Sequence, residues 1–319
     1  IQEFRHAARR TGLAYQTERS YVSKIRFFMR DRGLRNLRDF DRITARDVEA
    51  HLTDLAVDGN VAASTQNAAF HALLKLFELV LKRELGAINA IRANKRKPIP
   101  TVLGKNEVLD VLDELNGKYR TIAKLLYGCG MRISEALCLR VKDLDFENRL
   151  IQIHEAKGGK CRLVPMPENL VGELKRWVAS RSALHDHDVD QGVAAVYLPF
   201  ALGRKYPRAE RELKWQYLFA SDRLSADPRS GKLRRHHLHR ETFPRQLRKA
   251  IESAGILKHV TSHTFRHCFA THLLRSGTDI RTIQELLGHK DIQTTMIYTH
   301  VLLDRPGDVI SPLDQLQAA

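Results

Sequence analysis

Hydrophobic residues in the first 90 positions recur every three or four residues, which is the spacing of amphipathic helices. One stripe spans residues 21–29 and stops before Gly33. A second helix is predicted from Thr44, where Asp47 completes the pattern of a capping box. A third stripe spans residues 64–81. The pattern predicts a helical N-terminal domain whose apolar faces form a core and whose basic faces point outward.

A basic segment punctuated by prolines, residues 93–100, interrupts this helical pattern. Two prolines prevent a helix from continuing through it, so we expect a linker that separates a domain at 1–92 from one at 101–319. Its three consecutive basic residues, Lys95, Arg96 and Lys97, favour a linker that follows DNA. The alternative is an ordinary loop between helices.

Residues 101–319 combine helical patterns with one short alternating segment. Ile151 and Ile153 alternate with polar residues, and residues 163–165 follow a glycine turn, which predicts an antiparallel hairpin. Residues 185–240 follow neither period and are interpreted as irregular. The fold class expected is mainly α with a small antiparallel β-sheet. Helices are predicted near 105–115, 118–128, 168–183, 241–254, 262–275, 279–287 and 292–299.

The composition narrows the class of protein. The 43% hydrophobic content of the 319 residues suffices for real cores, so global disorder is excluded. No apolar run of membrane-spanning length and no signal-peptide pattern occur, so neither membrane insertion nor secretion is expected. Four cysteines without CxxC spacing indicate reduced thiols. We therefore expect a cytoplasmic protein.

The net charge of +16 points to a polyanionic partner, most often nucleic acid. The charge is uneven: residues 1–100 carry net +8, 101–200 net zero, 201–250 net +9 and 251–319 net −1. Two basic blocks flanking a neutral one suit contact with DNA phosphates from two sides. A solvated basic surface without a partner is the alternative.

The candidate chemistry lies mostly in the last 60 residues. His263 and Arg266 are three apart and share a helix face, and a Leu-Leu-Gly run precedes His289. Arginine forks match the oxygens of a phosphodiester and stabilise the negative charge of its transition state. A tyrosine is a weak nucleophile that needs such help, a lysine can protonate the leaving oxygen, and histidines can hydrogen-bond the phosphate. The candidate set is Arg132, Lys157, His263, Arg266, His289 and Tyr298.

Three histidines of one predicted helix, His263, His267 and His272, invite a zinc interpretation. No Cys or Glu completes a tetrahedral set at a recognised spacing, so neither a metal nor another cofactor is expected. His267 is interpreted as a histidine that packs beside the site.

Together, in this order and spacing, the motifs resemble those of the tyrosine recombinases, the lambda-integrase family. The resemblance covers residues 101–300, and the N-terminal helices fit the family's SAM-like core-binding domain. It implies a C-shaped DNA clamp. It also implies that Tyr298 attacks the scissile phosphate, forms a 3′-phosphotyrosyl link and frees a 5′-hydroxyl, which then attacks the partner strand. Glu135 matches a frequent family acid that orients its neighbours. No metal or nucleotide is required.

A long tract at about 198–240 resembles the extra segment of integron integrases, which recombine folded single strands of gene-cassette sites with a few extruded bases. Extruded bases need aromatic or imidazole faces to stack on. By resemblance, the base contacts are Trp215, Pro228, His236 and His237, with Arg234 and Arg235 on phosphates. The alternatives are burial of Trp215 in a core and a merely solvated basic loop. Trp177 is assigned to packing.

The function expected is therefore an integron integrase that integrates and excises gene cassettes. Its partner is DNA, both folded single-stranded cassette sites and double-stranded attachment sites. The resemblance implies a monomer when free and a homotetramer on DNA, in a bacterial cytoplasm at the nucleoid, with residues 301–319 as an arm passed to a neighbouring protomer or packed on their own domain. The alternatives are a recombinase of the phage-integrase or chromosome-dimer-resolution type, and a non-catalytic DNA-binding protein on the same fold.

Overall fold

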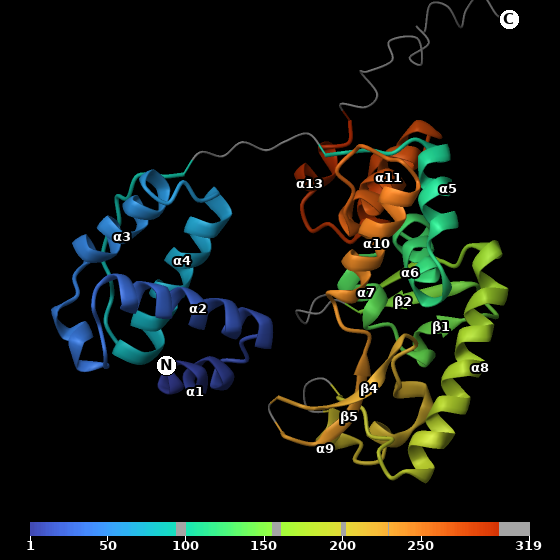
Figure 1. Cartoon of the computed structure of the whole chain (residues 1–319), viewed down its shortest axis with the longest axis horizontal. Helices are drawn as coiled ribbons and strands as arrows, with labels where there is room; N and C mark the ends of the chain where they lie inside the picture. The colour runs from blue at the N-terminus through green and yellow to red at the C-terminus, as the bar shows by residue number, and fades with distance from the viewer. Residues whose placement is uncertain (94–99, 155–160, 199–201, 229, 300–319) are drawn as a thin grey trace, which may run out of the picture. The chain divides into compact units, whose positions relative to one another are not determined.

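The computed structural model describes residues 1–93, 100–154, 161–198, 202–228 and 230–299 (Figure 1). The chain divides into two compact units, Ile1–Ile99 and Pro100–Ala319. Lys95, Arg96, Lys97, Lys157 and the arm at 301–319 lie outside the described residues. No helix of the described ranges is both long enough and apolar enough to cross a membrane.

The first unit is helical, as its periodicity predicts. Its core is one cluster of buried side chains that includes Phe28, Leu52, Leu73 and Phe77. The capping box at Thr44 is formed, with the Thr44 amide donating to Asp47 Oδ2 at 2.8 Å. The elements are α1 (Gln2–Arg10), α2 (Tyr15–Asp31), η1 (Arg38–Arg42), α3 (Ala45–Val57), α4 (Ala63–Leu76) and η2 (Phe77–Leu81).

The second unit is also mainly helical and contains two small antiparallel sheets. Its main core joins residues of α5, α6, α8, α10 and α11 to the first sheet. The helical elements are α5 (Lys105–Glu114), α6 (Gly117–Gly128), α7 (Ile133–Leu137), η3 (Val141–Asp143), α8 (Glu168–Asp190), α9 (Leu202–Lys205), η4 (Ala209–Arg211), η5 (Leu213–Trp215), α10 (Thr242–Ser253), α11 (Ser262–Arg275), α12 (Ile280–Leu287) and α13 (Gln293–Met296).

The predicted hairpin is confirmed. Strands β2 (Leu150–Ile153) and β3 (Arg162–Pro165) pair antiparallel, with Ile151 opposite Val164. A two-residue strand, β1 (Leu144–Asp145), extends this sheet. Both Ile151 and Ile153 are buried, as their alternation requires.

The interpretation of residues 185–240 as irregular is wrong. Helix α8 continues to Asp190, and strands β4 (Ala220–Ala226) and β5 (Leu233–His237) form a second hairpin. Neither strand buries an alternating apolar face, because β4 has no buried residue and β5 buries only Arg235. A half-buried strand is recognised by apolar alternation, and this hairpin has none to display.

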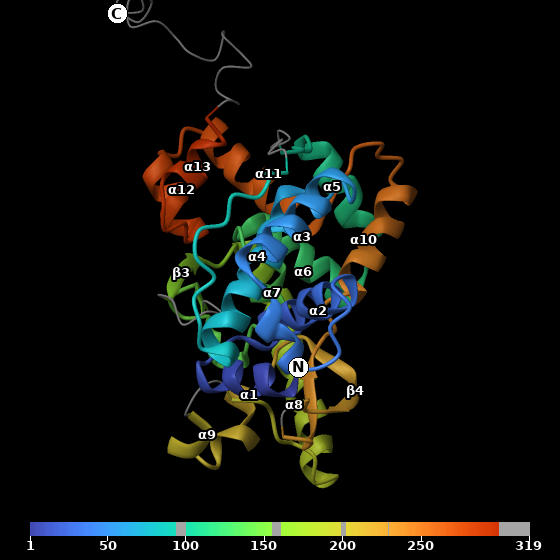
Figure 2. The same cartoon turned by 90° about the vertical axis from the view of Figure 1, so that its left-hand side faces the viewer.

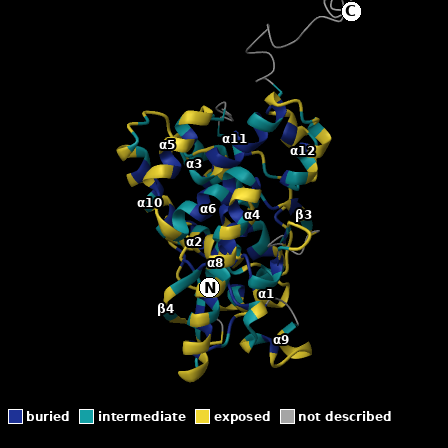
Figure 3. Cartoon of the chain, turned by 90° about the vertical axis from the view of Figure 1, so that its right-hand side faces the viewer, coloured by how far each residue is buried: buried dark blue, intermediate teal, exposed yellow. Residues whose placement is uncertain are grey.

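Helix α11 is the central element of the second unit. It is buried around most of its circumference, and it contacts α6 and α12 (Figure 3). Helices α12 and α13 lie beside it at one end of the unit (Figure 2). A helix enclosed in this way gives the residues on it a fixed position.

Candidate active site

A tight loop places Arg132. Gly130 has a φ of +59°, and a Cβ there would lie 2.5 Å from Phe269 Cδ1, so only glycine fits. The loop ends at Arg132, which is the N-cap of α7 and donates its amide to Glu135 Oε2 at 2.7 Å. The Arg132 side chain stays partly exposed, at 34%, and is open to an anion.

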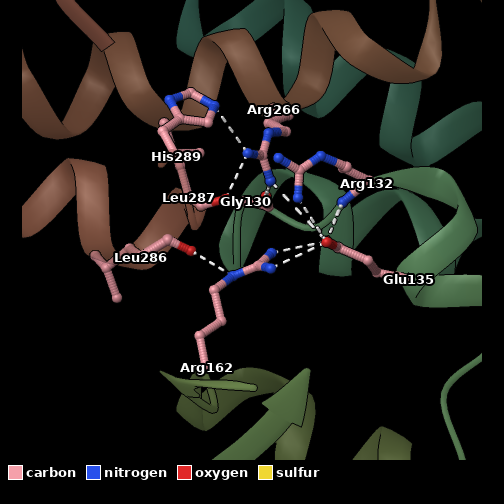
Figure 4. A network of polar contacts seen from close by, with 8 residues as sticks. All are labelled: Gly130, Arg132, Glu135, Arg162, Arg266, Leu286, Leu287 and His289. Atoms are coloured by element: carbon pink, nitrogen blue, oxygen red, sulfur yellow. Dashed lines mark hydrogen bonds and ion pairs between the residues drawn. The ribbon is translucent and has the colours of Figure 1, made fainter. Parts of the chain in front are cut away.

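Glu135 is the centre of a cluster of cations (Figure 4). Arg132 Nη1 donates to Glu135 Oε1 at 2.8 Å. Arg162 donates to both carboxylate oxygens, at 3.0 and 2.7 Å, and Arg266 Nη1 lies 4.0 Å from Oε2. Burial raises the pKa of Glu135, but the bonds and charges of Arg162 and Arg132 outweigh it and hold the pKa below its ordinary value. One carboxylate therefore holds three guanidinium groups close together.

Arg266 is fixed by backbone carbonyls. Its Nη1 donates to Gly130 O at 2.5 Å and its Nη2 to Leu287 O at 2.6 Å. Burial and the charge of Arg132 lower its pKa to about 9, so the group is still a cation at neutral pH. The cation is thus held in place before any ligand arrives.

His289 follows the end of α12 and contacts Arg266. Arg266 Nη2 lies 3.0 Å from His289 Nε2, and His289 Nδ1 lies 2.9 Å from Thr295 Oγ1. A guanidinium only donates, so Nε2 accepts and Nδ1 carries the proton. Burial and the neighbouring arginines lower the pKa of His289 to about 4, which keeps the ring neutral at pH 7.

Tyr298 is almost fully buried, with 2% of its surface exposed. It packs in a small cluster with Phe269, Leu274 and Leu287. Its hydroxyl lies 2.9 Å from Nδ1 of His267, the residue next to Arg266. Burial raises the pKa of Tyr298, and the charges of Arg266 and Arg132 oppose this rise. The phenol is therefore a protonated hydrogen-bond donor at neutral pH.

The structure brings most of the predicted set together. Arg132, Arg266 and His289 meet directly or through Glu135, while His263 lies one turn before Arg266 on α11 and is exposed. Burial, together with the charges of Arg266 and Arg132, lowers the pKa of His263. The result is a cationic surface whose histidines are neutral, which suits a phosphodiester.

Sequence reasoning missed Arg162. It stands on β3, ties Glu135 to the hairpin, and donates from Nε to Leu286 O at 2.8 Å. Gly288 leaves room for it, because a Cβ there would lie 3.0 Å from Arg162 Cδ. The only signal is an arginine directly before the predicted strand residues 163–165, and its partners are 27 and 124 residues away.

A second group of rings joins the middle of the tract at about 198–240 to the end of its hairpin. The Tyr217 ring lies 5.3 Å from His236 and 5.2 Å from His237, whose rings are 4.1 Å apart. The Arg140 guanidinium lies 4.4 Å from Tyr217 and 5.9 Å from Trp215. Trp215 is half-buried and packs against a small core cluster that includes Tyr217, so it is neither fully buried nor fully exposed. Pro228 is exposed in the turn between β4 and β5.

The prediction that Arg234 and Arg235 contact phosphates needs correction. Arg235 is buried and donates from Nε and Nη2 to the two Asp188 oxygens, each at 2.6 Å. Arg234 pairs with Glu210 and Asp227, and its side chain is 11% exposed. Carboxylates inside the fold neutralise both guanidinium groups, so part of this basic block does not add to the charge that faces DNA.

The structure also bears on Trp177 and on the zinc interpretation of the α11 histidines. Trp177 is a packing residue, as predicted: its ring contacts Phe219 and its Nε1 donates to Thr121 Oγ1 at 2.8 Å. His272 is engaged by Tyr127 Oη at 2.8 Å and Leu103 O at 3.0 Å. Within the described residues no group of three His, Cys, Asp or Glu is placed to hold a metal ion.

The first unit carries its own cationic hollow on α1 and α2. Arg5, Arg19, Arg26 and Arg30 line it. Phe27, 41% exposed, presents its ring there with the Arg30 guanidinium 5.2 Å from the centroid. This combination suits a phosphate backbone and a stacked base.

Comparison with known proteins decides the family. A family model described as the phage integrase family matches residues 101–305, and one described as the phage integrase N-terminal SAM-like domain matches residues 1–87. The chain belongs to this family of tyrosine recombinases. The resemblance inferred from the sequence, the mainly α fold with an N-terminal SAM-like domain, and the enzyme class are thereby confirmed. Enzymes of this family cleave and rejoin DNA through a covalent intermediate.

Several named relatives are integrases or tyrosine recombinases. The recombinase is 45% identical over 317 residues to an integrase/recombinase of Escherichia coli, covering 99% of this chain and 93% of the relative. It is 32% identical to the tyrosine recombinase XerD of Agrobacterium fabrum, covering 94% and 88%. Among solved structures, the Tn1549 transposon integrase gives a TM-score of 0.61 at 19% identity, covering 99% of this chain and 96% of that one. A lambda integrase dimer gives 0.57 at 18%, covering 98% of each. Both structures share its fold.

Proposed function

We propose that this recombinase is an integron integrase, which integrates and excises gene cassettes. The observation that carries the proposal is the group of Trp215, Tyr217, His236 and His237 around Arg140, in a tract of a kind that distinguishes integron integrases in the resemblance above. Trp215, His236 and His237 are half-buried beside the buried Tyr217 and Arg140, and partly exposed rings of this kind can stack on extruded bases. Burial lowers the pKa of His237 to about 4, so its ring is neutral and suited to stacking.

We assign the chemistry to the six family positions. Tyr298 attacks the scissile phosphate, the Oη–P bond forms and the P–O5′ bond breaks. Arg132 and Arg266 stabilise the charge on the non-bridging oxygens, and Lys157 gives a proton to the leaving 5′ oxygen. His263 hydrogen-bonds the phosphate, His289 accepts from Arg266 and so holds its guanidinium in place, and Glu135 orients the cations. The geometry supports this, because Arg132, Arg266 and His289 are preassembled.

The rest of the assembly follows from the family. We propose that both domains, 1–92 and 101–319, close on DNA as a C-shaped clamp, with Lys95, Arg96 and Lys97 of the linker on its backbone. Four copies act together on two sites, each passing residues 301–319 to a neighbour, while the free protein is a monomer. The place of action is the bacterial cytoplasm, at the nucleoid. The Tn1549 and lambda integrase structures were solved with DNA, which supports a DNA partner.

A suicide-substrate assay tests the proposal. A nicked cassette site is offered either as a folded single strand or as a duplex, and the covalent protein–DNA adduct is quantified. An integron integrase forms more adduct with the folded strand. Equal or lower yield on the folded strand contradicts the integron branch and favours a recombinase of the Xer or phage type.

Two variants sharpen this assay. Tyr298→Phe is expected to bind both substrates and form no adduct, whereas adduct at the wild-type level contradicts the assignment of the nucleophile. Trp215→Ala is expected to weaken binding of the folded strand by about 1–3 kcal/mol, the cost of one stacked base, with little change for the duplex. Tyr206→Ala is the matched control, an exposed aromatic of the same tract outside the group of rings. Equal loss on both substrates, or the same loss in the control, contradicts the role of Trp215.

A further inference from the structure

We propose that His267 is a catalytic residue of this recombinase: its Nδ1 takes the phenolic proton of Tyr298 during DNA cleavage and returns it during rejoining. The inference rests on the proposed role of Tyr298. It assigns a task to a residue that the sequence pattern assigned to packing.

The contact itself is the first argument. His267 Nδ1 lies 2.9 Å from Tyr298 Oη, within the distance required of a general base, and the ring centroids are 5.6 Å apart. Among the described residues, Tyr298 Oη has no other hydrogen-bond partner. A buried O–H needs an acceptor, so the phenol donates and Nδ1 accepts.

Burial is the second argument. Tyr298 is 2% exposed, so bulk water does not reach its hydroxyl to carry the proton away. The other groups of the site are poor acceptors for this proton: Arg132 and Arg266 only donate, and Nε2 of the neutral His289 already accepts from Arg266. His267 is left as the base in contact with the reacting atom.

The basicity of His267 responds to substrate. Burial, His263 and Arg266 lower its pKa to about 4 in the empty site, which keeps Nδ1 unprotonated and able to accept. The charged and titratable groups around the pair are His263 and Arg266 on α11, Arg132 before α7, and His289 after α12. A bound phosphodiester neutralises these cations and raises the pKa of His267. As the Oη–P bond forms, the acidity of the phenol rises steeply, so the transfer becomes favourable in the transition state.

The step balances. In cleavage the Oη–P bond forms, the P–O5′ bond breaks, the phenolic proton moves to His267 Nδ1, and the leaving oxygen takes a proton from Lys157. In rejoining the 5′-hydroxyl attacks phosphorus, its proton returns to Lys157, and His267 protonates the departing Tyr298. No metal, nucleotide or redox partner takes part.

His267→Asn tests this, because the Asn Oδ1 can accept the hydrogen bond but cannot take the proton. The rate of adduct formation is measured with saturating suicide substrate from pH 5 to 9. We expect a wild-type rate that falls in acid, where His267 is protonated, and reaches a plateau near neutrality. We expect the variant to be slower at pH 7 by about 10²–10⁴-fold, the usual effect of a general base, with unchanged DNA affinity. Its rate should keep rising with pH, because hydroxide must then take the proton.

A substrate with sulfur at the bridging 5′ position separates the two proton transfers. A thiolate leaves without a proton, so this substrate should rescue Lys157→Ala and leave His267→Asn slow. His272→Asn is the matched control, the same change five positions along α11, and it should cleave at the wild-type rate. Thermal unfolding checks that each variant is folded.

The outcomes are distinct. If wild type forms no adduct, the proposed function fails. If wild type forms adduct but His267→Asn cleaves within about threefold of it and keeps its pH profile, the role of His267 alone is overturned. Rescue of His267→Asn by the sulfur substrate also overturns it, since the defect would then lie in protonation of the leaving group.

Discussion

At the scale of single residues, Glu135 is the group on which the site depends. Its carboxylate is 4% exposed and faces three guanidinium groups. Cations packed this closely repel one another, and the buried carboxylate offsets that repulsion. The site therefore keeps enough positive charge for a phosphate while remaining stable without one.

The first prediction concerns Glu135→Gln. The change leaves Arg132, Arg162 and Arg266 without their shared anion, so the free energy of unfolding should fall by about 3–5 kcal/mol, the cost of breaking a buried pair. Urea denaturation at pH 7 measures it. Glu168→Gln, which removes an exposed partner of Arg149, is the control and should change stability by less than about 1 kcal/mol. Equal effects of the two changes would show that Glu135 does not hold the cations.

The same variant predicts a pH dependence. The folded state lowers the pKa of Glu135, so its stabilisation is present above the unfolded pKa of about 4.3 and is lost as pH falls through the folded value. The stability difference between wild type and Glu135→Gln should therefore shrink in acid. A difference that grows below pH 4 contradicts the direction of this shift.

The sequence was informative about residues that share a motif and silent about residues that meet only in the fold. Arg132, Arg266 and His289 come together as their order and spacing indicate. The sequence pattern favours packing for His267, because the contact with Tyr298 spans 31 positions. No local pattern encodes such a contact, since it depends on how α12 and α13 pack against α11.

At the scale of elements, the second hairpin is held to α8 by charge rather than by an apolar face. Arg235 on β5 donates to both oxygens of Asp188 on α8, and also to the carbonyls of Ser221 and Asp222 on β4. Arg181 adds a second buried guanidinium 3.8 Å from Asp188. A bidentate, buried pair fixes orientation more strictly than an apolar contact does.

The second prediction follows from this pair. Asp188→Ala leaves Arg235 and Arg181 buried without an anion and should lower the free energy of unfolding by about 3–5 kcal/mol. The double variant Asp188→Leu with Arg235→Met removes the bidentate pair but leaves Arg181 buried and charged, so it should recover part of that loss. Chemical denaturation measures both, and amide exchange of β4 and β5 reports where the loosening occurs. If the double variant is as unstable as the single one, the hairpin is held by something other than this pair.

Elements with strong periodicity were predictable and those without it were not. The alternation of Ile151 and Ile153 with polar residues predicts the β2–β3 hairpin, and both isoleucines are buried. Strands β4 and β5 bury between them only Arg235, whose partner lies 47 residues away. The sequence of these strands resembles a basic loop because Arg235, the residue that anchors the sheet, is itself basic.

At the scale of the whole molecule, net charge and DNA-binding charge are different quantities. The net +9 of residues 201–250 includes Arg234 and Arg235, which carboxylates neutralise inside the fold. The first unit keeps cations at its surface, because Arg19, Arg26 and Arg30 are exposed around the hollow beside Phe27. Only the exposed share of the charge releases counterions on binding DNA.

The third prediction is therefore about salt. Arg26→Ala should lower the slope of log affinity against log salt by about 1, the effect of one lost phosphate contact. Arg32→Ala is the control from the same unit, since Arg32 pairs with Asp31 and Asp54 and should leave the slope nearly unchanged. Binding to a duplex site, measured at several salt concentrations, gives both slopes. A control that changes the slope as much as Arg26→Ala would contradict this division of the charge.

The two-part helical fold was within reach of the sequence, because apolar periodicity marks the helices and two prolines break them. The distribution of usable charge was not, because it depends on which arginines find a carboxylate. Arg26 and Arg235 look alike in a sequence and differ completely in their surroundings.

The last two carbonyls of α12 both receive guanidinium hydrogens from distant parts of the chain, Leu286 from Arg162 and Leu287 from Arg266. The ends of short helices normally fray, and α12 has only eight residues. Helix α12 is held at this end by both hydrogen bonds, so it cannot unwind there without breaking them. The segment that carries Tyr298 is therefore anchored at its start to two arginines of the site, so a motion of the phenol that keeps both bonds has to begin beyond Leu287.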